Sequence, residues 1–283
     1  MDVEINGDIG RAARRVAEAG ALLITAGAGM GVDSGLPDFR GDKGFWKAYP
    51  PFERLGISFI DMANPNWFVR DPELAWGFYG HRLNLYRQTT PHRGFDVLKR
   101  WAEGLDCGAF VFTSNVDGHF QQAGFSRDRV IECHGSIGHL QCTEPCSNEI
   151  WTADDLEVEV NMDSFHAVSE LPTCPHCGAL ARPNVLMFGD WHWIPGRTTA
   201  QERRFSDWLA RAAGSKLVIV ELGAGSAVPT VRMTSEQIAS RSGATLVRIN
   251  PREPQARHGH FGLALDALEA LEVIDKRLES LSG

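Results

Sequence analysis

The segment that decides the fold reads ALLITAGAGMGVDSGLPDFRG over residues 21–41. A short apolar run with β-propensity breaks abruptly into glycines, which is how an α/β protein brings bare backbone N–H groups up to a phosphate. A glycine-rich strand end can equally be a tight turn. The continuation PDFRG at 37–41 favours a binding loop, because a turn alone requires no acid, aromatic residue and arginine beside a proline.

The rest of the chain repeats this pattern of apolar runs. Further short runs lie at 109–113, 129–132, 217–220 and 245–249, each followed by glycine or small polar residues. Helical patterns separate most of them, at 8–19, 71–86 and 93–101, and a last one closes the chain at 263–281. We therefore predict an α/β fold, a Rossmann-like doubly wound parallel sheet with its ligand crevice at the carboxyl ends of the strands.

The stretch at 45–52 interrupts this order, because it is rich in aromatic residues and proline. We interpret it as a semi-ordered loop that folds over a ligand, with a loop packed permanently on the core as the alternative.

Composition narrows the class of protein. Of 283 residues, 43% are hydrophobic and 23% charged, as in soluble globular proteins. The net charge of −8 argues against nucleic-acid and anionic-membrane partners. No apolar run is long enough to span a bilayer, and the acidic start MDVE does not resemble a signal peptide. We expect a cytoplasmic protein, and the sequence leaves its oligomeric state open.

Four of the six cysteines form two short-spaced pairs, Cys142 with Cys146 and Cys174 with Cys177. Without an export signal, such pairs are better interpreted as metal ligands than as disulfides, and two pairs suit a tetrahedral zinc site. Buried free thiols are the alternative. Four thiolates leave no open coordination position, so the zinc would be structural. We predict a small zinc-binding insertion at 138–186 in a Rossmann-like NAD-binding domain of residues 1–137 and 187–283.

The first glycine loop departs from the ordinary dinucleotide fingerprint. After Gly27 and Gly29 the third glycine is replaced by Val32, and no second strand with a terminal acid follows at the expected distance. A hydride-transfer enzyme is therefore disfavoured, whereas NAD binding is not.

Taken together, the segments resemble those of the sirtuins in the right order over nearly the whole chain. GAG at 27–29 with SGLPDFRG at 34–41 looks like their cofactor loop, and TSNVDG at 113–118 resembles their Thr-Gln-Asn-Ile-Asp segment. CHG at 133–135 resembles their catalytic His-Gly, the four cysteines follow at the right place, and RPNVLMFGD at 182–190 looks like their substrate-backbone segment. The chain is similar to a divergent bacterial-type member.

The resemblance implies an NAD-dependent protein-lysine deacylase, a deacetylase or an enzyme that removes succinyl or malonyl groups. Such an enzyme cleaves NAD to nicotinamide and O-acyl-ADP-ribose and acts on acyl-lysine proteins or peptides. It implies a general base at His134, with Asn115 positioning the ribose or a water and Asp117 holding the nicotinamide carboxamide. A turn histidine capped by backbone is the alternative for His134. The implied NAD-binding set is Gly27, Ala28, Gly29, Asp38, Phe39, Arg40, Ser114, Asn115, Asp117, His134, Gly223, Gly225, Ser226 and Asn250.

The substrate side of the site follows from the same resemblance. It implies substrate contacts at Val185, Phe188 and Gly189. In addition, Tyr79 and Arg82 resemble the Tyr-x-x-Arg pair of sirtuins that remove succinyl and malonyl groups. Residues three apart share a helix face, so a phenol and a guanidinium would converge on a carboxylate. The alternative is that Tyr79 packs in the core while Arg82 forms a surface ion pair.

Three departures from the family pattern stand out. Ser114 replaces the usual glutamine, Gly31 replaces the usual serine, and ELGAGS at 221–226 does not keep the Gly-Thr-Ser run. They put the adenosine contacts in doubt and leave mono-ADP-ribosyl transfer or NAD hydrolysis as the alternative reaction. A nucleotide-sensing module without turnover is the non-enzymatic alternative. The histidine at 134 favours deacylation.

Overall fold

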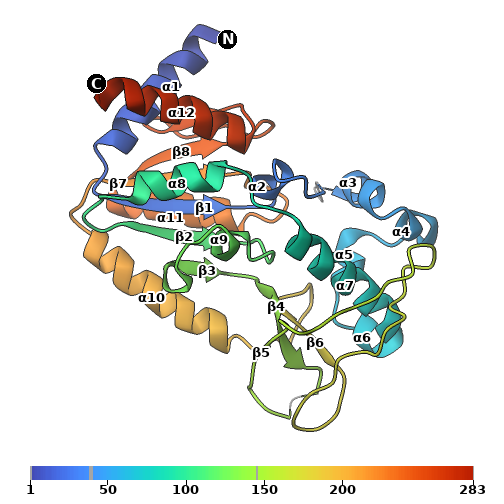
Figure 1. Cartoon of the computed structure of the whole chain (residues 1–283). Helices are drawn as coiled ribbons and strands as arrows, with labels where there is room; N and C mark the ends of the chain where they lie inside the picture. Colours follow the sequence, from blue (N-terminus) through green and yellow to red (C-terminus); the bar gives the residue numbers. More distant parts are fainter. Residues whose placement is uncertain (1, 38–40, 145, 283) are drawn as a thin grey trace.

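A computed structural model describes residues 2–37, 41–144 and 146–282 of the chain. Its centre is a six-stranded parallel sheet in the order β3-β2-β1-β7-β8-β9, with helices on both faces (Figure 1). The strands are β1 (Ala21–Ala26), β2 (Ala109–Thr113), β3 (Val130–Glu132), β7 (Leu217–Leu222), β8 (Thr245–Ile249) and β9 (Phe261–Leu263). The predicted doubly wound sheet is confirmed, and the three-residue strand β9 is an addition to it.

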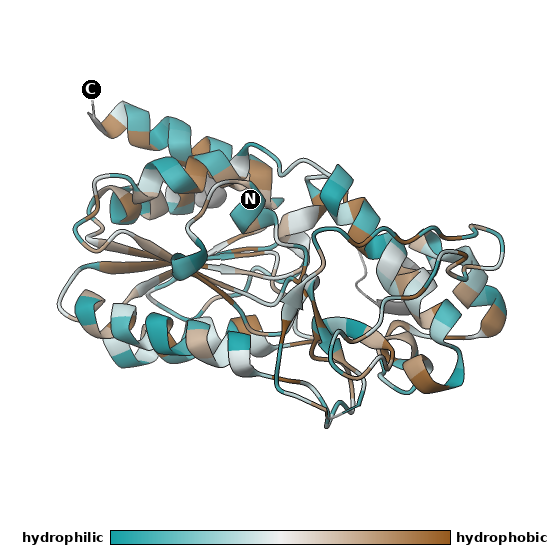
Figure 2. Ribbon diagram, turned by 60° about the horizontal axis from the view of Figure 1, so that its bottom comes forward, coloured by the Kyte–Doolittle hydropathy of each residue, from teal (hydrophilic) through white to brown (hydrophobic). Residues whose placement is uncertain are grey.

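The strands are continuous apolar runs because both faces of the sheet are covered. Every residue of β1 and β7 is buried. Alternate residues of β1 face opposite layers: Leu22 and Ile24 join one hydrophobic cluster, and Leu23 joins the other. Figure 2 shows the apolar strands between helices that carry their polar residues outward.

Helices from distant parts of the sequence form the two outer layers. One layer holds α1 (Asp2–Ala17), α8 (Gly94–Ala102) and α12 (Ala267–Ser282), and the other holds α10 (Gly196–Ala212) and α11 (Thr230–Ser242). The predicted start of the first helix at Asp8 is wrong: Asp8 lies inside α1 and pairs with Arg11 one turn later. None of the helices in the described ranges combines the length and apolar character that crossing a bilayer requires.

The interpretation of residues 45–52 as a semi-ordered loop is wrong. These residues form the end of α3 (Gly41–Ala48) and the start of α4 (Pro50–Leu55), with Tyr49 between the two helices. The side chains of Phe45, Tyr49 and Phe52 are fully buried. The rings of Phe45 and Phe52 stack with centroids 5.5 Å apart. Proline in the first turn of α4 starts a helix rather than breaking one, because its missing N–H would have no partner there.

Further short helices complete this helical module around one long helix. The short ones are α5 (Phe59–Met62) and α6 (Trp67–Arg70), and the long one is α7 (Pro72–Gln88). Three more short elements, α2 (Gly29–Val32), α9 (His119–Gln122) and the 3-10 turn η1 (Arg127–Arg129), lie in loops of the main sheet. The long helix α7 begins as predicted, with the Asp71 carboxylate accepting the Leu74 N–H at 3.0 Å and Pro72 in its first turn.

The cysteine-bearing insertion forms a second sheet of three antiparallel strands in the order β5-β4-β6. Its strands are β4 (Gly135–Cys142), β5 (Trp151–Thr152) and β6 (Ala181–Val185). The predicted limits of the insertion, 138–186, stay a prediction. Strand β4 of its sheet starts three residues before the first of these limits, at Gly135.

The insertion is tied to α7 through two glycines of that helix. A Cβ atom at Gly77 would lie 1.9 Å from the carbonyl oxygen of Phe165, and one at Gly80 would lie 2.3 Å from a Val158 methyl group. The Phe165 side chain is buried, with its backbone at φ 60°. Asn84 adds a hydrogen bond of 2.8 Å to the Val158 carbonyl. These contacts hold one face of α7 against the insertion, so the opposite face of the helix, which carries Tyr79 and Arg82, is turned away from it.

Candidate active site

The predicted site residues come together because five parallel strands end at one edge of the sheet. The register aligns Ala26 of β1 with Thr113 of β2 and Leu222 of β7, and it aligns Leu222 with Ile249 of β8. Thr113 is also level with Glu132 of β3. The residues that directly follow these strand ends are therefore neighbours: Gly27, Ser114, Cys133, Gly223 and Asn250.

The glycines of the first loop serve a close contact between two loops. Gly27 donates its N–H to Leu222 O at 2.9 Å, and Gly29 donates to Gly223 O at 3.0 Å. A Cβ atom at Gly29 would lie 2.6 Å from the Gly223 Cα, and Gly223 itself has φ +59°. The expectation that these two N–H groups face a phosphate is therefore not met, because the glycines bring the β1 and β7 loops together instead.

Asn115 and Asp117 are held on the turn after β2. The Asn115 side-chain amide donates to Gly27 O at 3.1 Å, and its backbone N–H donates to the Thr113 hydroxyl at 3.0 Å. Asp117 accepts the backbone N–H of His119 at 2.9 Å. Both side chains are half-buried and thus remain partly accessible.

His134 follows β3 and faces the start of α11. Its carbonyl accepts the Leu186 N–H at 2.9 Å, and its ring Nε2 lies 3.5 Å from the Thr230 hydroxyl. Burial lowers the pKa of His134 below the ordinary 6.5. The imidazole is therefore neutral at neutral pH, which is the form that accepts a proton.

The buried carboxylate of Glu132, two residues before His134, is not among the predicted site residues. Glu132 is 1% exposed, pairs with Arg197 of α10 and accepts a hydrogen bond from the Gln201 amide at 3.3 Å. The Glu132 backbone N–H and C=O bond to the side chains of Gln201 and Thr198, at 3.1 Å each. These contacts fasten the strand end that carries His134 to α10.

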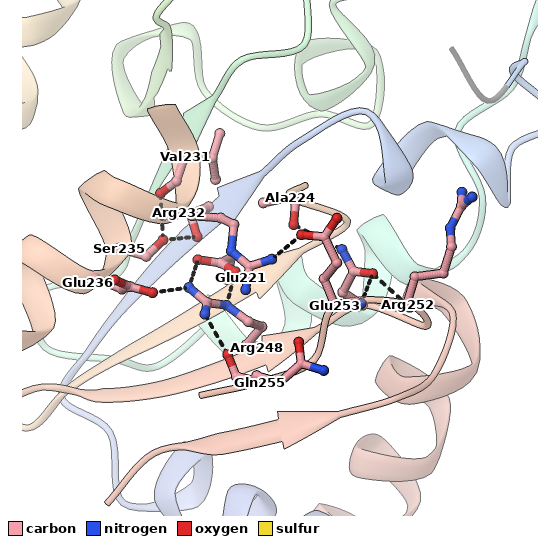
Figure 3. A network of polar contacts seen from close by, with 12 residues as sticks. Glu221, Ala224, Val231, Arg232, Ser235, Glu236, Arg248, Arg252, Glu253 and Gln255 are labelled. Carbon is pink, nitrogen blue, oxygen red and sulfur yellow. Dashed lines mark hydrogen bonds and ion pairs between the residues drawn. The ribbon is translucent and has the colours of Figure 1, made fainter. Parts of the chain in front are cut away.

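The adenosine side of the predicted site is braced by a polar network between β7, β8 and α11 (Figure 3). The Arg248 guanidinium pairs with the buried Glu221 carboxylate and donates to Glu236 at 2.9 Å and to Gln255 O at 2.7 Å. Asn250, 2% exposed, donates to Ala224 O at 2.9 Å. The Asn250 side chain thus shapes the loop that carries Gly225 and Ser226.

The predicted substrate segment follows β6 and is fixed by hydrogen bonds to other parts of the chain. Val185 is buried, the backbone N–H of Phe188 donates to Ala63 O at 2.9 Å, and Gly189 has φ +68°. The side chain of Asp190 is fully buried and receives two hydrogen bonds from Arg182, at 2.7 and 3.0 Å. Phe188 is left 36% exposed, three residues after Val185, which pairs with Gly135 of β4.

The predicted acyl pair lies on one face of α7. Arg82 is 7% exposed, and its guanidinium carbon is 5.1 Å from the centroid of the Phe78 ring. Tyr79 is fully buried, and its hydroxyl has no hydrogen-bond partner among the described residues. Burial raises the pKa of Tyr79, and the positive charge of Arg82 opposes that rise. Of the alternative, the packing of Tyr79 in the core is met, since its ring stacks on Phe68 with centroids 5.7 Å apart. The surface ion pair of Arg82 is excluded, because that side chain is buried.

The four predicted zinc ligands form one cluster. Their sulfur atoms all lie within 4.8 Å of one another, with Sγ–Sγ distances of 3.6 Å for Cys142–Cys177 and for Cys146–Cys174. A disulfide needs about 2.05 Å. Thiolates at about 2.3 Å from a tetrahedral zinc lie about 3.8 Å apart. The cluster therefore fits zinc, whereas Cys107 and Cys133 lie elsewhere as partly buried thiols.

The predicted loop contacts at Asp38, Phe39 and Arg40 fall outside the described residues. All other predicted site residues lie within them.

Comparisons with known proteins agree with this geometry. The Sir2 family model matches residues 27–219. An NAD-dependent protein deacylase of Aeropyrum pernix is 32% identical over 94% of this chain and 96% of its own, and one of Thermococcus kodakarensis is 36% identical over 75% and 74%. A solved complex of a substituted Sir2 homologue with ADP-ribose has 25% identity and a TM-score of 0.69, covering 96% of this chain and 97% of its own. The chain belongs to the Sir2 family.

Proposed function

We propose that the chain is an NAD-dependent protein-lysine deacylase that prefers acyl groups ending in a carboxylate. Family membership and the names of its relatives support the deacylase activity. The observation that carries the acyl preference is the buried Arg82 guanidinium beside the unpartnered Tyr79 hydroxyl.

NAD fits the donor set at the carboxyl edge of the sheet. Asn115 and Asp117 would hold the nicotinamide half, and the loop of Gly225 and Ser226 would hold the adenosine half. At Gly225 a Cβ atom would meet nothing within 4 Å among the described residues, so the chain leaves room there. When bound, NAD supplies a ribose carbon whose bond to nicotinamide is broken as the acyl oxygen attacks it.

His134 supplies the base for this reaction. Its neutral Nε2 would accept the proton of a ribose hydroxyl in place of the 3.5 Å contact that this nitrogen makes with the Thr230 hydroxyl. Glu132, fastened to Arg197, fixes the strand end on which His134 sits. Phe188 and Gly189 would support the backbone of the acyl-lysine peptide next to it.

The zinc site stabilises the structure and takes no part in the chemistry. Four thiolates complete a tetrahedral shell, so Cys142, Cys146, Cys174 and Cys177 leave no position for a substrate. We further propose a cytoplasmic location, because thiolate zinc sites persist in a reducing compartment.

Replacing Arg82 by glutamine tests the acyl preference. We expect kcat/KM for a succinyl-lysine peptide to fall about 30-fold or more, since removing one partner of a buried charge pair costs about 2 kcal/mol or more. Deacetylation of the same peptide should fall much less, because the acetyl group has no carboxylate. The measurement is a comparison of both peptides by mass spectrometry.

Arg87→Gln is the matched control on the same helix. Arg87 donates to the Leu156 carbonyl at 2.6 Å on the opposite face of α7. It should not change the ratio of succinyl to acetyl activity. Equal losses for both peptides in Arg82→Gln would refute the acidic-acyl preference while leaving deacylation itself in place.

A further inference from the structure

Tyr86 lies one turn after Arg82 on α7, on the face that also carries Tyr79. Its side chain is 5% exposed. The opposite face of the helix is immobilised by the cysteine-bearing insertion through Gly77 and Gly80. The close packing of the insertion against Gly77 and Gly80 therefore prevents α7 from rotating and fixes the position of Tyr86.

The Tyr86 hydroxyl fixes the orientation of Arg82. It accepts hydrogen bonds from Nε at 2.8 Å and from Nη2 at 2.6 Å of the same guanidinium. One oxygen thus binds the Nε–Nη2 edge of the planar group and opposes its rotation. The two-pronged recognition of a carboxylate requires such a fixed guanidinium plane.

The other side of Tyr86 contacts the turn of Asp117. The Tyr86 carbonyl lies 3.4 Å from Nε2 of His119, and the two rings meet edge to face with centroids 6.3 Å apart. The His119 backbone N–H in turn donates to the Asp117 carboxylate at 2.9 Å. Tyr86 therefore spans the distance between the proposed acyl pocket and the proposed nicotinamide contact.

The proton of the Tyr86 hydroxyl is directed away from Arg82. Both lone pairs of the oxygen accept from the guanidinium, and the described residues give the hydroxyl no further hydrogen-bond partner. Burial raises the pKa of Tyr86, Arg82 opposes the rise and the Asp117 charge adds to it. The hydroxyl thus stays protonated, and Asp117 is a charged group near enough to influence that proton.

We infer that Tyr86 is a positioning residue that orients Arg82 for the carboxylate of the acyl group and links the acyl pocket to the Asp117 turn. This inference rests on the proposed preference for acidic acyl groups and adds a second residue to it. In this arrangement Tyr86 touches neither the acyl carbon nor the ribose. Its hydroxyl acts through Arg82, and its carbonyl and ring contact His119 on the turn of Asp117.

Tyr86→Phe tests the inference, because it removes the hydroxyl and keeps the ring. We expect the succinyl-to-acetyl ratio of kcat/KM to fall about 10-fold, the cost of lost hydrogen bonds to a charged group. The change should lie mainly in KM for the succinyl peptide. The nicotinamide concentration that halves activity should stay unchanged, because the backbone carbonyl and the ring make the contacts with the turn of Asp117 and phenylalanine keeps both. In an Arg82→Gln background, Tyr86→Phe should have no further effect on the ratio.

Trp76→Phe is the matched control for losing a buried hydrogen bond on α7, since the Trp76 indole donates to Ala181 O at 2.9 Å. It should lower the melting temperature without moving the ratio or nicotinamide inhibition. An unchanged ratio in folded Tyr86→Phe overturns the inference, as does an additive effect in the double variant. If Arg82→Gln lowers the ratio and Tyr86→Phe does not, only the role of Tyr86 fails. If Arg82→Gln leaves the ratio unchanged, the acyl preference fails too.

Discussion

Replacing His134 by alanine is expected to lower the rate of NAD-dependent deacylation roughly 10²- to 10⁴-fold, the usual contribution of a general base. The physical reason is that no other imidazole takes its place at the end of β3 in the described structure. His139 lies further along β4, where burial and the charges of Arg197 and Arg127 lower its pKa. The rate of acyl release from an acyl-lysine peptide at saturating NAD is the measurement.

The same histidine sets the expected pH profile. Because burial lowers the pKa of His134 below 6.5, the neutral base persists as the pH falls through 6.5. Activity should therefore hold at pH 6.5 and decline only at lower pH, where the ring gains a proton. The variant His258→Ala, at an exposed position between β8 and β9, is the control and should keep full activity. Full activity in folded His134→Ala would refute the assigned base.

Removing zinc is expected to have the largest effect on stability. Structural zinc binds zinc-finger peptides with an apparent free energy of about 10–16 kcal/mol, which is comparable to the whole stability of a domain. The insertion also packs Phe165 against Tyr49 and Phe52, with ring centroids 5.2 Å apart in each pair. Loss of the metal should therefore loosen the helical module as well as the three-stranded sheet.

We expect Cys142→Ser, or metal removal by a strong chelator, to lower the melting temperature by about 10 °C or more. A loss of about 5 kcal/mol corresponds to a shift of that size in a domain of 150–250 residues. Metal analysis of the purified protein should give one zinc per chain before treatment. Cys107→Ser, outside the cluster, is the control. An unchanged melting temperature in zinc-free protein would contradict a structural metal.

The sheet could be predicted because burial on both faces makes each strand a continuous apolar run. Strand β9 escaped because Phe261–Leu263 has only three residues, with the first two partly exposed. The aromatic stretch at 45–52 differs from the prediction because proline disrupts the interior of a helix but is tolerated in its first turn. Residues 45, 49 and 52 follow the spacing of one helical face, and that spacing is a signal of core packing.

The candidate site could be predicted in part for a similar reason. Residues after parallel strands meet at one edge, so the order of motifs was enough to bring Asn115 and His134 together. The support of Glu132 by Arg197 could not be predicted, because the partners lie 65 residues apart in the sequence. Tyr86 did carry a signal, since it follows Arg82 at the i, i+4 spacing.

The roles of the glycines also needed the structure. A glycine in the sequence indicates that the chain needs a small residue at that position. It does not indicate which neighbouring group requires the space. At Gly29 that neighbour is the Gly223 backbone rather than a ligand. The first segment, 21–41, therefore positions the site partly by allowing two loops to touch.

The central claim is that the chain transfers the acyl group of a modified lysine to the ADP-ribose part of NAD. The direct measurement follows nicotinamide, deacylated peptide and O-acyl-ADP-ribose together by mass spectrometry, with acetyl- and succinyl-lysine forms of one peptide. The account predicts that all three products appear in equal amounts and only when acylated peptide is present, with the succinyl peptide preferred. Nicotinamide release without O-acyl-ADP-ribose, or ADP-ribose attached to protein, would contradict it.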